Sequence, residues 1–340
     1  MTFFLAAPLR SSRAHLQVLV AALVLLALPL ALEAAEPPPS WQQTLTQGRV
    51  LVLGDSITQE GRYVSYLEYY LKRLSPGATA DLISIGLSSE TMSGLTEAGH
   101  PFPRPCVLER LDRALKAVAP KVVFACYGMN DGIYHPSSPE RMMAFERGLK
   151  DLIAQVRGAG ARLVLVTPPV FDALPIQSRT VPLTSPVFTY NAPFVDYDTV
   201  LAEFATLERS LKAPDIEVID LHASMLQSLT ARRTTDATFT YAPDGVHPGD
   251  AGHLLIAQTI LRGLGYSDTM NEAEGELNRI AADPLFALIK ERRELRSESW
   301  LPFVGYQKGG SFKSDFVKAA ERVAVRLQRE IDALAAAGPR

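Results

Sequence analysis

Five short apolar runs recur along the chain, and their spacing constrains the fold more than any other feature. Each run is five to seven residues long and is built mainly from Val, Ile and Leu. Because they are largely apolar instead of alternating with polar residues, these runs indicate strands that are buried on both faces of a sheet. The runs are 49–53, 81–85, 121–127, 162–166 and 216–220.

Helical periodicities separate these runs. In one of them the apolar positions are Leu108, Leu111, Leu115 and Val118. Before another, Ser138 is a good helix cap and Pro139 suits the first helical turn. A last helix is expected over 250–264. Strands that alternate with helices of this length predict an α/β fold, in which helices cover both sides of a parallel five-stranded sheet.

Glycine and polar residues gather just after the expected strands. GDS (54–56) follows the first strand, Gly86 the second, GMND (128–131) the third and TPP (167–169) the fourth. In open α/β sheets the ligand crevice lies outside the carboxyl ends of the strands. We therefore expect a site at this edge of the sheet. Residues 170–193 are proline-rich and aperiodic, which suits either a binding loop or a plain surface excursion.

Beyond the last expected helix of the sheet the pattern changes. A helix capped at Asp283 runs to about Arg296, and an apolar periodicity over 316–334 marks a long amphipathic helix. Between them we expect an aromatic loop over 299–310. Residues 266–340 are therefore interpreted as a C-terminal helical extension docked on the main domain.

The N-terminus differs in composition from the rest of the chain. Arg10 and Arg13 precede an uncharged, almost wholly apolar run over 18–32, and a proline-rich stretch follows. This order is typical of a secretory signal, and the run is shorter than the roughly 20 residues that span a membrane. An export signal is expected, with an uncleaved membrane anchor as the alternative. The expected parts are a signal or anchor at 1–35, a linker at 36–47, a main domain at 48–265 and the extension at 266–340.

Charge and cysteine content exclude some functions. The formal net charge is -3 and no block of like charge stands out, so the sequence lacks the basic surface of a nucleic-acid-binding protein. Cys106 and Cys126 have neither zinc-type spacing nor a CxxC redox spacing. Export would permit a disulfide between them, but Cys126 lies in an apolar run. We expect two unpaired thiols.

Three polar residues could together carry nucleophilic chemistry. Ser56 ends the GDS tripeptide, but a serine hydroxyl is a poor nucleophile without an adjacent base. His247 in DGVHP is the candidate base, and Asp244 precedes it by three residues. On a tight turn, that spacing brings the carboxylate to the histidine Nδ1, where it fixes the tautomer and stabilises the imidazolium. Each residue alone has an ordinary structural explanation as a cap, a turn residue or a packed histidine.

Acyl transfer also requires hydrogen-bond donors for the developing oxyanion. Ser56 lies where a strand ends and a helix begins, so its own N–H is free to donate. Gly86 allows close backbone approach and offers a second N–H, and Asn130 offers a side-chain amide. A turn glycine and a turn asparagine are the ordinary alternatives for these two positions.

These motifs resemble those of the SGNH hydrolases, the GDSL esterase and lipase family. GDSIT (54–58) resembles the first of the four family blocks, GMND the third and DGVHP the last. The second block departs from the pattern. The family often has an asparagine two places before its glycine and a second glycine three places after it, where this sequence has Ser84 and Ser89. The resemblance covers about residues 49–264.

The resemblance implies a flavodoxin-like three-layer α/β/α domain and a serine esterase that needs no metal or organic cofactor. It implies Ser56 as nucleophile, His247 as base and Asp244 as the residue that orients it. The oxyanion hole would consist of the N–H groups of Ser56 and Gly86 and the amide of Asn130. Together with export, this predicts hydrolysis of short acyl esters, notably acetyl esters on carbohydrate, through an acyl-enzyme.

Other functions remain open on the sequence. The same triad could act as an O-acyltransferase, a lipase or a thioesterase. From a different class, the chain could be a carbohydrate-binding protein or a membrane-tethered assembly protein on a non-catalytic scaffold. A small or polysaccharide ester is the expected partner, and membrane contact is expected only through an uncleaved N-terminus.

A few aromatic residues are weaker candidates for substrate contact. Tyr63 lies close to GDSIT and is a modest candidate. Trp300, Phe303 and Tyr306 could stack on a sugar ring, although covering an apolar surface is the favoured interpretation.

Two charged clusters have structural interpretations. The arginines of the extension are expected to form a solvated helix face; they are Arg292, Arg293 and Arg296. A metal site built from His247, Asp250 and His253 is not favoured, because the expected helix turns these side chains in different directions.

Overall fold

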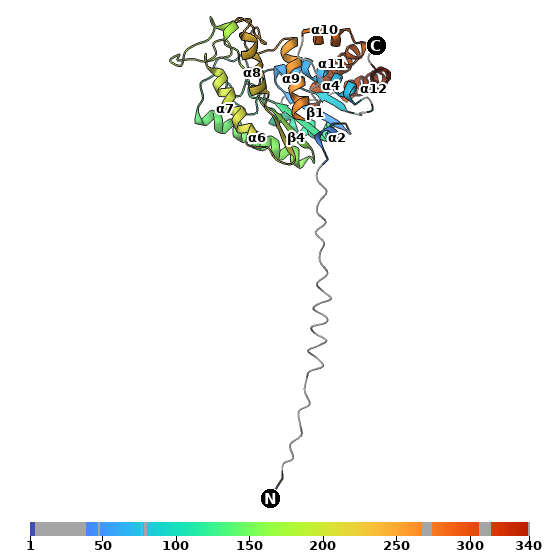
Figure 1. Ribbon diagram of the computed structural model, residues 1–340. Coiled ribbons are helices and arrows are strands. Elements are labelled where there is room, and N and C mark those ends of the chain that lie inside the picture. The colour runs from blue at the N-terminus through green and yellow to red at the C-terminus, as the bar shows by residue number, and fades with distance from the viewer. Residues whose placement is uncertain are drawn as a thin grey trace. The chain divides into compact units, whose positions relative to one another are not determined.

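A five-stranded, all-parallel sheet forms the centre of the computed structural model (Figure 1). The model describes residues 1–3, 39–46, 48–75, 77, 80–266, 274–305 and 314–338. The strand order is β2-β1-β3-β4-β5. The strands are β1 (Arg49–Gly54), β2 (Asp81–Ser84), β3 (Val122–Cys126), β4 (Arg162–Val166) and β5 (Ile216–Ile219). All five expected strands are thus confirmed.

The two faces of the sheet carry separate cores, because successive side chains of a strand point to opposite faces. Val50 and Val52 pack with one set of helices, and Leu51 and Leu53 with another. The first set includes α4 (Arg62–Leu74), α8 (Leu221–Arg233) and α9 (Asp250–Gly263). The second includes α5 (Leu108–Val118), α6 (Pro139–Gly158) and α7 (Tyr197–Arg209). This is the predicted three-layer α/β/α arrangement.

The order of the strands creates a crevice at their carboxyl ends. From β1 the chain runs to β2 on one side and then returns to β3 on the other. The loops that follow β1 and β3 therefore leave the sheet in opposite directions, which opens a gap between them. The GDS and GMND motifs follow these two strands.

The C-terminal extension wraps the β2 edge of the sheet. It consists of α10 (Glu274–Ala282), α11 (Pro284–Val304) and α12 (Ser314–Ala337). Leu285 and Ile289 of α11 belong to the core on one face, whereas Trp300 and Val304 belong to the core on the other. Helix α11 therefore covers the edge strand, which would otherwise expose unpaired backbone groups.

Helix α11 corrects two expectations. It continues to Val304, with Pro302 inside it, where a loop was expected from residue 299. Trp300 is buried, and its indole N–H donates to Glu321 at 2.7 Å, so this aromatic covers an apolar surface as favoured.

The arginine cluster of α11 is not a solvated face, because the side chains of Arg292, Arg293 and Arg296 are all buried. The reason is that carboxylates of β2, α4 and α12 face it.

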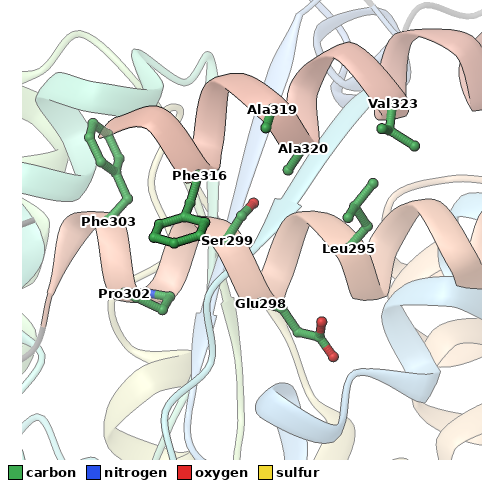
Figure 2. Close-up of a pocket in the computed structure, with 9 residues that line it drawn as sticks. All are labelled: Leu295, Glu298, Ser299, Pro302, Phe303, Phe316, Ala319, Ala320 and Val323. Atoms are coloured by element: carbon green, nitrogen blue, oxygen red, sulfur yellow. The ribbon is translucent and has the colours of Figure 1, made fainter. Parts of the chain in front are cut away.

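A large apolar groove lies between α11 and α12 (Figure 2). Its volume is about 630 Å³. Phe316 and Phe303 lie at one end of it and Leu295 and Val323 at the other. None of the predicted catalytic or oxyanion-hole residues lines this groove. Of the weaker candidates for substrate contact, Phe303 lines it, and Tyr306 lies outside the described residues.

The N-terminal expectations are tested only in part. The predicted signal falls almost wholly in residues 4–38, which lie outside the described residues. Within the predicted linker the structure instead has a helix, α2 (Trp41–Leu45), which is capped by Ser40 and packs Trp41 under the Arg162 guanidinium, 3.6 Å from the ring centre. Among the helices that the model describes, none is long and apolar enough to cross a membrane.

The two cysteines are unpaired, as expected. Cys126 is buried in β3, and Cys106 is half-buried in the segment just before α5.

Candidate active site

Ser56 opens the short helix α3 (Ser56–Glu60) directly after β1. The cap of this helix is Asp55, whose carboxylate accepts the Ile57 N–H at 3.0 Å. Ser56 itself is therefore not the capping side chain, contrary to the simplest interpretation of a serine after a strand. Its hydroxyl is free for other contacts, and its N–H belongs to the first turn of a helix, where backbone donors have no partner within the helix.

A tight turn holds Asp244 and His247 together. One oxygen of Asp244, Oδ1, accepts the backbone N–H groups of Val246 at 2.9 Å and His247 at 2.7 Å. The other, Oδ2, lies 2.7 Å from His247 Nδ1. Gly245 has φ +85°, a conformation that L side chains rarely adopt. Asp172, from the predicted binding loop, donates its N–H to the Gly245 carbonyl at 2.9 Å and so supports the turn.

The turn delivers His247 to Ser56. The Nε2 atom of His247 lies 2.8 Å from Ser56 Oγ, although the residues are 191 positions apart in the sequence. With its Nδ1–H donated to Asp244, neutral His247 has a free lone pair on Nε2 and can accept the serine proton. The hydrogen bond to Asp244 raises the pKa of His247 above its ordinary value, against the opposing effect of burial. Burial opposes ionisation of Asp244, but the hydrogen bonds from His247 and from the Val246 N–H together outweigh it and lower the pKa of Asp244.

Asn130 lies in the loop after β3, and its amide is held from three sides. Its Oδ1 accepts from Arg104 Nη1 at 2.9 Å and from Tyr134 Oη at 3.3 Å, and its Nδ2 donates to the Glu90 carbonyl at 3.3 Å. The neighbouring Asp131 is buried and accepts three backbone N–H groups: those of residues 92 and 93 tie this loop to the segment after β2, and that of Gly128 closes the loop itself. The asparagine is therefore fixed in a rigid loop.

A model of the GDSL-like lipase/acylhydrolase family matches residues 52–255. The chain belongs to this family. Its members hydrolyse carboxylic esters, so the protein is an ester hydrolase of the GDSL type. A comparison with curated protein sequences found no significant match.

Several solved structures are similar to this GDSL-type chain. The acetylxylan esterase Axe2 from Geobacillus stearothermophilus is 21% identical, with a TM-score of 0.46, and the match covers 65% of this chain and 96% of that one. LAE5, an α/β hydrolase from the metagenome of Lake Arreo, Spain, is 20% identical, with a TM-score of 0.45 and coverages of 65% and 96%. BT4096, a gut microbial diltiazem-metabolizing enzyme, is 20% identical, with a TM-score of 0.49. That match covers 65% of this chain and only 48% of BT4096.

The second family block is where this GDSL hydrolase departs from the usual pattern. Gly86 packs against α3 so closely that a Cβ there would lie 2.3 Å from the Gln59 nitrogen. Three residues later, Ser89 stands where the family often has a second glycine, and its φ is +65°. The Ser89 carbonyl and Asn130 Oδ1 contact the same Arg104 nitrogen, at 3.4 and 2.9 Å. The backbone of Ser89 therefore lies near Asn130. The family motif does not predict this position for a serine, and its positive φ is not visible in the sequence.

Two other candidates from the sequence are engaged elsewhere. Tyr63 is buried, and its hydroxyl contacts Thr58 Oγ1 at 2.9 Å, so it is not exposed to a substrate. His253 is also buried, stacks on Tyr63 and contacts Glu60 at 3.1 Å through Nε2. It does not share a cluster with His247, and the part of the chain that the structure describes contains no group of three potential metal ligands.

Asp55 gives this site an unusual charge balance. Burial raises the pKa of its carboxyl to about 7, although the Ile57 N–H and the nearby His247 both oppose that rise. The residue directly before Ser56 therefore carries a carboxyl that is largely protonated below neutral pH.

Proposed function

We propose that the protein is an exported serine esterase that hydrolyses short-chain acyl esters, above all acetyl esters carried on carbohydrate. The observation that carries this proposal is the unbroken chain from Ser56 Oγ to His247 Nε2, 2.8 Å, and from His247 Nδ1 to Asp244, 2.7 Å. A nucleophile, a base and a residue that orients the base are the three parts that acyl transfer to a serine requires.

In the first half-reaction His247 takes the Ser56 proton while Oγ attacks the ester carbonyl. The tetrahedral oxyanion then receives hydrogen bonds from the Ser56 N–H and the Asn130 amide. His247 next gives its proton to the leaving alcohol, and an acyl-Ser56 intermediate remains. In the second half-reaction His247 activates a water, which attacks the acyl carbonyl and releases the acid and free Ser56.

The third oxyanion donor comes from the segment after β2. Gly86 is the donor predicted from the family pattern and stays a prediction. The N–H of Ser89 is the alternative, because its residue neighbours Asn130 through Arg104. A side-chain substitution leaves the backbone N–H in place and therefore cannot show which of the two residues donates to the oxyanion. Replacing the backbone amide by an ester at each position removes the N–H and identifies the donor.

Two observations support a short acyl group on a polar alcohol. The apolar groove between α11 and α12, which could hold a long acyl chain, is lined by none of the proposed catalytic and oxyanion-hole residues. The N-terminal sequence has the features of an export signal, and outside the cell polysaccharides are an accessible source of acetyl esters. An acyltransferase is the second candidate, because the same acyl-enzyme can pass its acyl group to a sugar hydroxyl.

The test is acetate release from acetylated xylooligosaccharides beside hydrolysis of p-nitrophenyl acetate and palmitate. We expect release of acetate and a strong preference for the short ester, both lost in Ser56→Ala and retained in Ser210→Ala, which changes an exposed serine outside the site. Preference for palmitate would contradict the short-chain proposal. Acetyl transfer to added oligosaccharide at the expense of free acetate would favour the acyltransferase.

A further inference from the structure

Arg104 is a buried cation beside the proposed oxyanion site. It comes from residues 94–105, between β2 and α5, and only 2% of its side chain is exposed. Its Nε and Nη2 donate to the two oxygens of Glu97, each at 2.7 Å. A guanidinium held in this bidentate way has a fixed plane and a fixed direction for its remaining N–H groups.

The remaining nitrogen, Nη1, points to Asn130. It lies 2.9 Å from Asn130 Oδ1, where Tyr134 Oη is a second and longer donor at 3.3 Å. Tyr134 also lies beneath the guanidinium, with 5.6 Å between the Arg104 Cζ atom and the ring centre. Its φ is +60°, and that of Ile133 is +49°, so the loop adopts a costly backbone conformation to hold Tyr134 there.

An asparagine that stabilises an oxyanion needs a hydrogen-bond donor on its own amide oxygen, because this donor fixes which end of the amide faces the oxyanion. Its amide has a donor end and an acceptor end of nearly equal size, and rotation by half a turn exchanges them. With Oδ1 bound to two donors, the NH₂ group must face the other way. One of its hydrogens lies toward the Glu90 carbonyl at 3.3 Å, and the second is available to a ligand. In the flipped amide, a carbonyl would face the oxyanion and repel it.

We propose that Arg104 is a positioning residue of the esterase, which fixes the Asn130 amide so that its N–H, and not its carbonyl, faces the oxyanion. This inference rests on the proposed function. The charge of Arg104 acts in the same direction, because a cation bound to the amide oxygen polarises the amide and strengthens its N–H as a donor. Glu97 holds the Arg104 guanidinium in place through two hydrogen bonds and balances its charge.

The competing explanation is that the Arg104–Glu97 pair only anchors a loop. Glu97 Oε1 also accepts the Tyr190 N–H at 3.4 Å, so the pair joins residues 94–105 to the predicted binding loop. An anchor would act on stability or on substrate affinity. A positioning residue acts on kcat, and only as long as Asn130 is present.

A double-mutant cycle separates these roles. Asn130→Ala should lower kcat by about 100- to 1000-fold. Arg104→Met should lower kcat by about 10- to 100-fold and leave KM within about threefold, because the amide no longer has a fixed orientation in the transition state. In the Asn130→Ala background, Arg104→Met should have almost no further effect on kcat. Losses that multiply in the double variant, or an unchanged kcat in Arg104→Met, would overturn the positioning role.

Arg292→Met is the matched control. Arg292 is 4% exposed and pairs with the fully buried Glu68 at 2.8 Å, so its loss removes a similar pair in the C-terminal extension. Its kcat should stay within about twofold of wild type. An equal loss of kcat in both variants at equal thermal stability would mean that Arg104 acts through general stability. Should Arg104→Met fail to fold, Arg104→Lys enters the same cycle, since it keeps a cation beside Glu97 but lacks the fork.

The same experiments distinguish the two proposals. Wild-type activity that survives Ser56→Ala, or no activity at all, would overturn the proposed function and this inference with it. Activity that depends on Ser56, combined with multiplicative losses in the cycle, would overturn the role of Arg104 alone.

Discussion

Buried arginines lie near the start of strand β2 and in the loop that follows it, and the two sets have different kinds of partner. At its start, Arg292 and Arg296 of α11 converge on Asp81, and Arg296 also donates to the Leu82 carbonyl at 2.9 Å. Every partner of this cluster that the structure describes belongs to the scaffold. Beyond the other end of β2, Arg104 makes a similar fork on Glu97 but directs its third nitrogen to Asn130. The same ionic chemistry thus secures an edge strand in one place and orients a proposed catalytic amide in the other.

The proposed catalytic residues contrast with both sets of arginines. The side chains of His247 and Asp244 are 43% and 52% exposed, whereas the arginine side chains are almost fully buried. Exposure leaves His247 able to exchange protons with substrate and water. Burial of the arginines removes competing water, so a lost partner is not replaced by solvent. Substitutions at the two kinds of position should therefore affect different measurements.

The largest effect is expected from Asp244→Asn. The asparagine can still accept the backbone N–H groups of the turn, but it no longer holds His247 in the required tautomer, and kcat should fall by about 10⁴-fold. Thermal stability should change little.

The pH profile of this variant adds a second readout. His247 must be neutral to accept the serine proton, so kcat/KM rises with pH through the pKa of His247. Because Asp244 raises that pKa, the wild-type midpoint should lie above the ordinary value of about 6.5, and Asp244→Asn should move it down. A midpoint that stays in place would show that Asp244 does not act on His247.

The next largest effect is expected from the loss of Arg292, which lies at the start of β2. Arg292→Met leaves Glu68 without this partner in a fully buried position, and the free energy of unfolding should fall by about 3–5 kcal/mol. Urea unfolding measures this change. If kcat fell as well, the contrast between Arg292 as a purely structural residue and Arg104 as a positioning residue would be lost.

A smaller effect, visible mainly as a pH dependence, is expected from Asp55→Asn. Burial raises the pKa of Asp55 to about 7, so between about pH 4 and pH 7 the folded protein binds a proton that the unfolded chain releases. Stability therefore decreases as pH rises through this window, by at most about 4 kcal/mol. The raised pKa of His247 acts in the same sense, since its contribution is also lost as pH rises through the folded pKa.

Asn is also a good helix cap, so Asp55→Asn should retain α3. It should remove the contribution of Asp55 to the pH dependence of the free energy of unfolding. Urea unfolding of the wild type and the variant at pH 5 and pH 8 measures this difference. Equal slopes in the two proteins would mean that Asp55 is ionised throughout.

The sequence predicts the sheet well, because a strand buried on both faces is visible in its own residues. The same holds for the cap of α6, where Ser138 accepts the Arg141 N–H at 3.3 Å and Pro139 follows. The extent of α11 was missed, since Pro302 normally argues against a helix and only the burial of Trp300 and Val304 explains its continuation.

The site divides in a similar way. Ser56, Asn130 and the Asp244–His247 turn lie in short motifs with recognisable spacing. Arg104 lies in no such motif, and its contacts with Glu97 and Asn130 exist only once the loops after β2 and β3 are folded together. The buried arginines of α11 were misread for the same reason, because a helix sequence alone does not say which carboxylates face it.

The most direct test of the central claim is the covalent labelling of Ser56. The intact protein is treated with a fluorophosphonate at neutral pH, and the adduct is counted and located by mass spectrometry. We expect one adduct per chain, on Ser56, with equal labelling of Ser210→Ala, much slower labelling of Asp244→Asn and none of Ser56→Ala. An unlabelled wild-type protein, or an adduct that persists in Ser56→Ala, would contradict the assignment of Ser56 as the nucleophile.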